Sequence, residues 1–64
     1  MNLCAVCNRH WPSYTLFVRH MTREHGIDRD NLWRRIEQSD GNPVTAVRSV
    51  GGRWALFVQG SLHL

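Results

Sequence analysis

The stretch from Cys4 to His25 decides the fold of this chain of 64 residues. It begins CAVC, with two residues between Cys4 and Cys7, and ends HMTREH, with four residues between His20 and His25. Twelve residues separate Cys7 from His20. Two thiols and two imidazoles are the donors of a closed, tetrahedral zinc site. One tight turn can direct both sulfurs to a single point, and the end of one helix can carry both histidines. The stretch therefore predicts one structural zinc ion, with Cys4, Cys7, His20 and His25 as its ligands.

A redox or disulfide Cys-x-x-Cys pair is the competing interpretation of the two cysteines. A chain this short buries only about 60% of its unfolded surface, and so small a core rarely stabilises a fold by itself. A disulfide across two residues would constrain almost nothing. A zinc ion bound also by His20 and His25 would connect distant segments, with apparent binding free energies on the order of 10–16 kcal/mol in zinc-finger peptides. The size of the chain therefore favours zinc.

A ββα unit is expected over residues 1–26. Residues 1–11 should form a short hairpin that carries both cysteines at its turn, and Pro12 then blocks further strand pairing. Trp11 is expected to fold across onto Phe17 and to enclose the metal in an apolar shell.

The helix of this unit is predicted over residues 14–25. Ser13 is a good N-cap because its hydroxyl can accept a hydrogen bond from the first turn. Gly26 follows where a left-handed C-cap is wanted. Local signals therefore define both ends of the helix.

This pattern resembles the two-Cys, two-His (CCHH) zinc finger family. That family places a basic residue two positions after the second cysteine, an aromatic residue four positions after it, and a large apolar residue three before the first histidine. The matching residues here are Cys4, Cys7, Arg9, Trp11, Phe17, His20 and His25. The resemblance covers about 22 residues and implies both the ββα fold and the structural zinc.

The same resemblance implies which residues would contact nucleic acid. Arg19 could form a bidentate contact to guanine, whereas Leu16 offers only apolar contact. A solvated helix face explains Arg19 and Arg23 equally well, and one finger covers only about three base pairs. The positions that correspond to DNA-reading and phosphate-contacting residues of the family are Arg9, Ser13, Thr15, Leu16, Arg19 and Arg23.

Residues 27–41 predict a second helix, from about residue 29 to 39, with Asp28 as its N-cap. Its apolar stripe consists of Leu32, Trp33 and Ile36. A His-Gly-apolar step followed by a second helix resembles the prokaryotic Ros/MucR-type finger domains. In those domains the second helix packs on the finger and lets a single finger bind DNA.

Residues 44–59 alternate with a period of two and predict a β-hairpin, with Gly51-Gly52 as a two-residue turn. This register turns Thr45, Val47, Trp54, Leu56 and Val58 towards the second helix, chiefly onto Trp33 and Ile36. It turns Ala46, Arg48, Arg53 and Phe57 away. The hairpin could complete the core, form a dimer or partner interface, or do both. Residues 60–64 form a tail whose Leu62 and Leu64 add apolar surface.

The whole chain, residues 1–64, is thus expected to be a single, small α+β domain stabilised by zinc. Its net charge is +3, and all eight basic residues are arginine. Neither a secretory signal nor a membrane span of roughly 20 apolar residues is visible, and reduced cysteines that hold a metal fit the cytoplasm.

The predicted function is nucleic-acid binding by a prokaryotic or phage-type DNA-binding regulator of transcription. Its auxiliary phosphate contacts would be Arg29, Arg34, Arg35, Arg48 or Arg53. The alternative is a protein–protein interaction module that uses the apolar C-terminal hairpin, as a homodimer or with another partner. Catalysis is not expected because a four-coordinate zinc has no open position, and no metal role is expected of His10 or His63.

Overall fold

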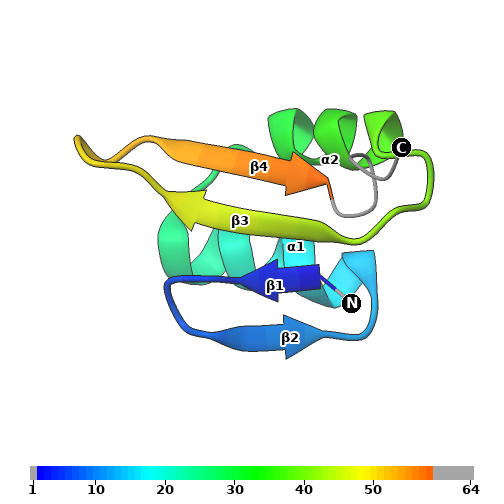
Figure 1. Cartoon of the computed structure of the whole chain (residues 1–64), viewed down its shortest axis with the longest axis horizontal. Coiled ribbons are helices and arrows are strands. Elements are labelled where there is room, and N and C mark those ends of the chain that lie inside the picture. Colours follow the sequence, from blue (N-terminus) through cyan, green and yellow to red (C-terminus); the bar gives the residue numbers. More distant parts are fainter. Residues whose placement is uncertain (1, 59–64) are drawn as a thin grey trace, which may run out of the picture.

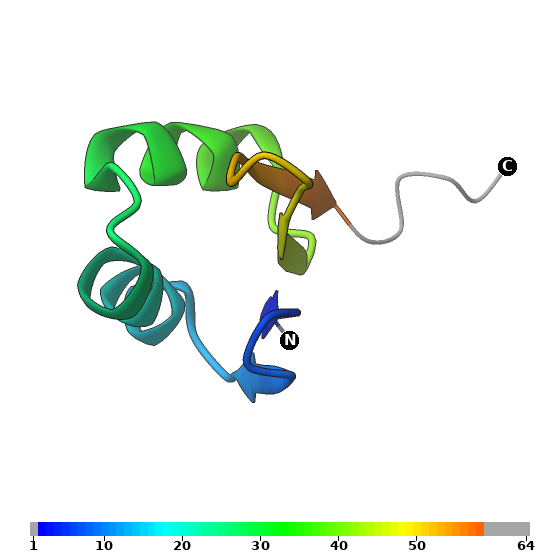
Figure 2. The same ribbon diagram turned by 90° about the vertical axis from the view of Figure 1, so that its left-hand side faces the viewer.

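The computed structural model describes residues 2–58, in which two helices lie on the same side of a four-stranded sheet (Figures 1 and 2). The predicted α+β class is confirmed. In chain order the elements are β1 (Asn2–Cys4), β2 (Arg9–Trp11), α1 (Tyr14–His25), α2 (Arg29–Gln38), β3 (Val44–Arg48) and β4 (Trp54–Val58). Met1, the end of the predicted hairpin at Gln59, and the predicted tail at 60–64 with His63 lie outside the described residues.

The two predicted hairpins join into one sheet, in the order β2-β1-β3-β4. β1 runs parallel to β3, with Leu3 opposite Thr45 and Cys4 opposite Ala46 (Figure 1). The buried Asn2 side chain adds to this junction because its Oδ1 accepts the Val44 N–H at 3.0 Å. β1 and β3 are far apart in the sequence, so local patterns do not reveal their pairing. The finger hairpin thus gains a third and a fourth strand.

Helix α1 begins and ends where the sequence predicts. The Ser13 hydroxyl accepts the Leu16 N–H at 3.3 Å. At the other end Gly26 adopts a left-handed conformation with φ 67°, and its N–H reaches the Thr22 carbonyl at 3.1 Å. The next N–H, that of Ile27, reaches the Met21 carbonyl at 3.3 Å. These two bonds are typical of a Schellman cap, which satisfies carbonyls at the end of the helix.

Helix α2 ends one residue before the predicted boundary, at Gln38. Asp28 occupies its N-cap, but the Asp28 side chain makes no capping hydrogen bond. The loop after α2 is tied to the start of α1, because the Tyr14 hydroxyl donates to the Asn42 carbonyl at 2.6 Å. None of the helices among residues 2–58 is both long enough and apolar enough to cross a bilayer.

The predicted register of the C-terminal hairpin is wrong by one residue. Ser49 pairs with Arg53 through an N–H···O=C bond of 2.7 Å, and the Ser49 hydroxyl donates to the same carbonyl at 2.8 Å. Three residues, 50–52, therefore form the turn, which is closed by the Gly52 N–H on the Ser49 carbonyl. Positive φ angles at Gly51 and Gly52, 98° and 81°, make this turn possible.

A one-residue shift turns every side chain of a strand to the opposite face. Val44 and Ala46 consequently face the helices and are buried, whereas Thr45 and Val47 face away from them. The faces predicted for β4 are correct. We call the side without helices the open face of the sheet; its residues are Leu3, His10, Thr45, Val47, Ala55 and Phe57.

The buried apolar residues form one core that both halves of the chain build. They are Cys4, Phe17, Val18, Met21, Leu32, Ile36, Val44 and Ala46. The predicted stripe of α2 is correct for Leu32 and Ile36. Trp33, however, is half-buried beside α1 and does not lie under the hairpin. The core therefore depends on the finger and on the C-terminal hairpin together.

Candidate metal centre

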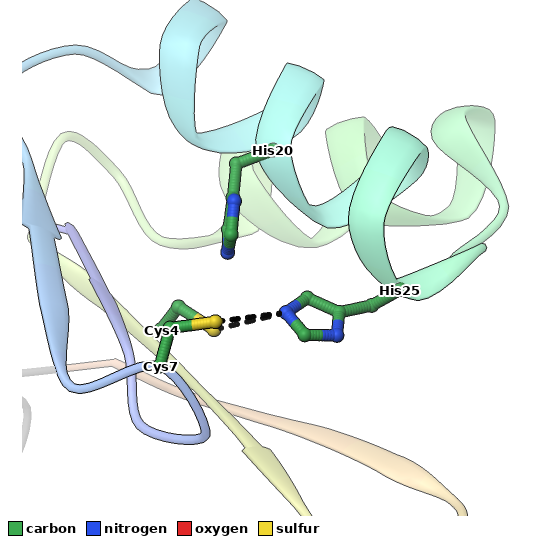
Figure 3. A group of neighbouring side chains, drawn as sticks. All are labelled: Cys4, Cys7, His20 and His25. Carbon is green, nitrogen blue, oxygen red and sulfur yellow. Dashed lines mark hydrogen bonds between the residues drawn. The ribbon is translucent and has the colours of Figure 1, made fainter.

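Four side chains from three segments point towards one another beneath α1 (Figure 3). Their donor atoms, two sulfurs and two ring nitrogens, all lie within 4.8 Å of one another. The Sγ atoms of Cys4 and Cys7 each lie 3.4 Å from Nε2 of His25. Both cysteines are free thiols. The residues that the sequence predicts as ligands are therefore brought together as one cluster: Cys4, Cys7, His20 and His25.

The two sulfur–nitrogen separations fit a tetrahedral zinc ion. Zinc lies about 2.3 Å from a thiolate sulfur and about 2.0–2.1 Å from an imidazole nitrogen. With tetrahedral angles, those bond lengths place a sulfur and a nitrogen about 3.5 Å apart. The observed distances of 3.4 Å agree. The prediction of one structural zinc site is thus confirmed by the donor set and its geometry.

The local fold explains how the donors converge. Cys4 ends β1, the second strand of the sheet, and is fully buried between β2 and β3. Cys7 lies in the exposed turn that follows, where Asn8 turns the chain with φ 54°. Asparagine tolerates this left-handed conformation better than most residues do. His20 and His25 come from the last two turns of α1.

One histidine nitrogen in this cluster lacks a partner. The Nε2 atom of His20 is buried, and no hydrogen-bond partner reaches it among residues 2–58. Buried polar atoms are nearly always paired, and an unpaired one calls for an explanation. A bound zinc ion supplies the missing partner, because a neutral imidazole nitrogen is one of its preferred ligands.

Two tryptophans cover the two histidines. Trp11 stacks on His20, with ring centroids 4.8 Å apart, and Trp54 packs against His25 at 4.9 Å. Trp11 also packs against the core cluster to which Phe17 belongs. Trp54 belongs to β4, and no spacing in the sequence associates it with the metal. The apolar shell is therefore built by both hairpins.

The surroundings of the cluster shift two pKa values. Loss of solvent around its sulfur, together with the neighbouring Cys4 thiol, raises the pKa of Cys7 above its ordinary value. Burial lowers the pKa of His20, and the nearby His25 lowers it further. The lowered pKa keeps the His20 ring neutral, which is the form that binds a metal. The Cys7 thiol, in contrast, must release its proton when zinc binds.

Acidification is expected to release zinc and to unfold the protein. Because the pKa of His20 is lowered in the folded state, its contribution is complete above the ordinary histidine value of about 6.5 and is lost as the pH falls below it. Protonated histidines and thiols cannot bind the metal. Bound zinc per chain and the circular dichroism spectrum, followed from pH 7 downwards, should fall together. Full zinc content at a pH well below the histidine range would contradict this expectation.

The six residues predicted to contact nucleic acid lie in different environments. Thr15, Leu16, Arg19 and Arg23 are exposed along the outer side of α1. The Ser13 hydroxyl is occupied as the helix cap. The Arg9 guanidinium lies over the Trp11 ring, 4.4 Å from its centroid.

The arginines predicted as auxiliary phosphate contacts lie in different parts of the structure. Arg29 shares a groove with Arg19 and Arg23, whereas the Arg48 guanidinium lies over the Trp54 ring at 5.8 Å. Arg53 directly follows the turn at 50–52, where its carbonyl accepts the Ser49 N–H. His10 is exposed on the open face and is not among the metal donors.

Comparison with known proteins adds no relative: no family model, no curated protein and no solved structure matches this chain. These comparisons therefore give no support to the resemblance to Ros/MucR-type domains. What the fold and the site define is a small α+β protein with a two-Cys, two-His zinc site, in which a second helix and a β-hairpin extend a ββα unit.

Proposed function

We propose that this protein is a small DNA-binding regulator that contacts DNA through the outer side of α1. The observation that carries the proposal is the meeting of three arginines from two helices. Arg19 and Arg23 of α1 and Arg29 of α2 line one groove, and no carboxylate among residues 2–58 lines it with them. Guanidinium groups bind phosphates and guanine edges in a bidentate manner.

The zinc site supports this role by fixing the helix. His20 and His25 lie on α1, so a metal bound to them and to the two cysteines holds the helix against the sheet. Arg19 and Arg23 are exposed residues of the same helix. An α-helix fits the major groove of duplex DNA. Arg29 lies on the neighbouring helix and would then contact a phosphate beside the major groove. A single finger without a second helix lacks this contact.

Arg19→Gln is expected to weaken binding of duplex DNA at low salt by about tenfold, which corresponds to about 1.4 kcal/mol. The reason is the loss of one charged contact that the neutral amide does not replace. The slope of log affinity against log salt should also fall by about one. Fluorescence anisotropy of a labelled duplex, titrated with the zinc-loaded protein, measures both effects.

Arg53→Gln is the matched control. It removes the same charge from a residue that the sequence offers only as an auxiliary phosphate contact and that does not line the groove of Arg19, Arg23 and Arg29. It should reduce affinity much less than Arg19→Gln does. Equal losses for the two variants would mean that only net charge matters. Absence of any complex between the unaltered protein and duplex DNA at low salt would overturn the proposal.

A protein-interaction module is the second candidate, and one observation favours it. Phe57 is 58% exposed on the open face of the sheet, opposite half-buried Thr45, and half-buried Val47 and Leu3 lie on the same face. No helix covers this face among residues 2–58. Sedimentation equilibrium of the zinc-loaded protein tests the homodimer. If the protein sediments as a monomer at the highest soluble concentration, and Phe57→Ser does not change its mass, the homodimer is contradicted.

A further inference from the structure

A groove of about 260 Å³ lies between the outer sides of α1 and α2. It is smaller than the roughly 300–1,000 Å³ pockets that enclose drug-sized ligands, so it suits one unit of a longer molecule better than a whole ligand. The residues that matter for its chemistry are Thr15, Arg19, Thr22, Arg23, Arg29 and Trp33. We call this the α1–α2 groove.

The charge of the groove selects an anion. Arg19 and Arg23 lie one turn apart on α1, and Arg29 opens α2 opposite them. The carboxylate of Glu24 does not line this groove. It lines a neighbouring hollow with His20, and Arg19 and Arg23 border both hollows. Three arginines line the groove and no carboxylate of the described chain does, which favours a phosphate.

Trp33 gives the same groove an aromatic surface. Its ring is half-buried, because one side packs against the core, and it lines the groove. The other two tryptophans each have an arginine over the ring, Arg9 over Trp11 and Arg48 over Trp54. No such contact covers Trp33 within residues 2–58. Its face is thus not taken up by a guanidinium of the described chain, and an aromatic side chain is a stacking surface for any base.

Thr22 adds an unused hydrogen-bonding group. Its hydroxyl is buried and has no partner in the described part of the chain, although Thr22 lines the groove. Thr15 contributes a second hydroxyl, on an exposed residue of the same helix. The groove therefore combines cationic donors, hydroxyl groups and one aromatic ring.

We propose that the α1–α2 groove binds one unpaired nucleotide of a single-stranded nucleic acid. Arg19, Arg23 and Arg29 hold its phosphate, and its base stacks on Trp33. In a duplex the bases are already stacked on each other, so Trp33 has a role only when the strand is single. This inference rests on the proposed nucleic-acid binding and deepens it, because it names an unpaired strand as a ligand.

Three probes separate the groups that the groove recognises. The zinc-loaded protein is titrated at low salt with a labelled oligothymidylate of about twelve nucleotides, a length within the usual range of single-strand sites. The second probe is an abasic strand of the same length, which keeps the phosphates and lacks the bases. The third is a duplex. The oligothymidylate should bind about tenfold more tightly than the abasic strand.

Trp33→Leu should weaken oligothymidylate binding about tenfold and should leave abasic-strand and duplex binding within about twofold. Trp33→Phe keeps an aromatic ring and should recover most of the affinity. Phe57→Leu is the matched control, because it removes an exposed aromatic ring from the open face, and it should change nothing. Zinc content and circular dichroism establish that each variant is folded.

The unaltered protein provides a test that does not depend on the variants. Its three tryptophans give three indole N–H signals. Oligothymidylate should shift the Trp33 signal more than it shifts the other two, and the abasic strand should not.

Equal binding of oligothymidylate by Trp33→Leu and the unaltered protein, or an unshifted Trp33 signal on saturation, would overturn this inference. If the duplex still bound, the proposed DNA-binding function would stand. Binding of the single strand with loss in Trp33→Leu, but no duplex binding, would support the groove and overturn the duplex proposal. Binding of no probe by the unaltered protein would overturn both.

Discussion

Replacing Cys7 with serine is expected to unfold all of residues 2–58. A serine hydroxyl is a poor zinc ligand, so the variant loses most of a binding free energy on the order of 10–16 kcal/mol. That exceeds the roughly 3–5 kcal/mol that the core of so small a domain supplies. Cys7 is exposed, so its replacement removes no core contact. The effect therefore reports the metal alone.

The sequence alone implies that only the N-terminal half unfolds in this variant. The structure extends the expected unfolding to the C-terminal hairpin. β1 pairs with β3, and Trp54 of β4 covers His25. The far-ultraviolet circular dichroism of the Cys7→Ser variant should accordingly lack the signals of both helices and of the sheet. Ala5→Ser, in the same exposed turn, is the matched control and should keep zinc and fold. A native spectrum for Cys7→Ser would contradict the account.

Replacing Phe17 with alanine is expected to cost about 3–5 kcal/mol in the free energy of unfolding. Phe17 is fully buried and is among the largest side chains of the core, so its removal leaves a cavity that neighbouring side chains fill only in part. Urea unfolding of the zinc-saturated protein, at a fixed concentration of free zinc, measures the change.

Leu16→Ala is the neighbouring control for the Phe17 experiment. Leu16 is 40% exposed on the same helix, and its truncation should cost less than about 1 kcal/mol. Similar losses at the two positions would mean that the core is not centred on Phe17 as described.

The features that local chemistry determines could be predicted from the sequence. Helix α1 was defined by Ser13 and Gly26, whose capping roles depend only on neighbouring residues. The four metal donors followed from the spacing of Cys4, Cys7, His20 and His25, because zinc constrains the type and separation of its ligands. Helix α2 followed from the spacing of Leu32 and Ile36.

The features that depend on distant residues could not be predicted. The turn of the C-terminal hairpin contains two glycines, which suit a two-residue turn as well as the three-residue turn at 50–52. That choice decides whether Ala46 or Val47 faces the core. The pairing of β1 with β3 and the contact of Trp54 with His25 arise only when the chain is folded. The α1–α2 groove likewise needs Trp33 beside α1, where the stripe of α2 alone does not place it.

The central claim is that one zinc ion, bound by these four residues, holds the fold together. A titration of zinc into metal-free protein, followed by circular dichroism, tests it most directly. We expect an unfolded spectrum without metal and a return of the native spectrum that is complete at one zinc ion per chain. A native spectrum that persists after complete removal of zinc would contradict the claim.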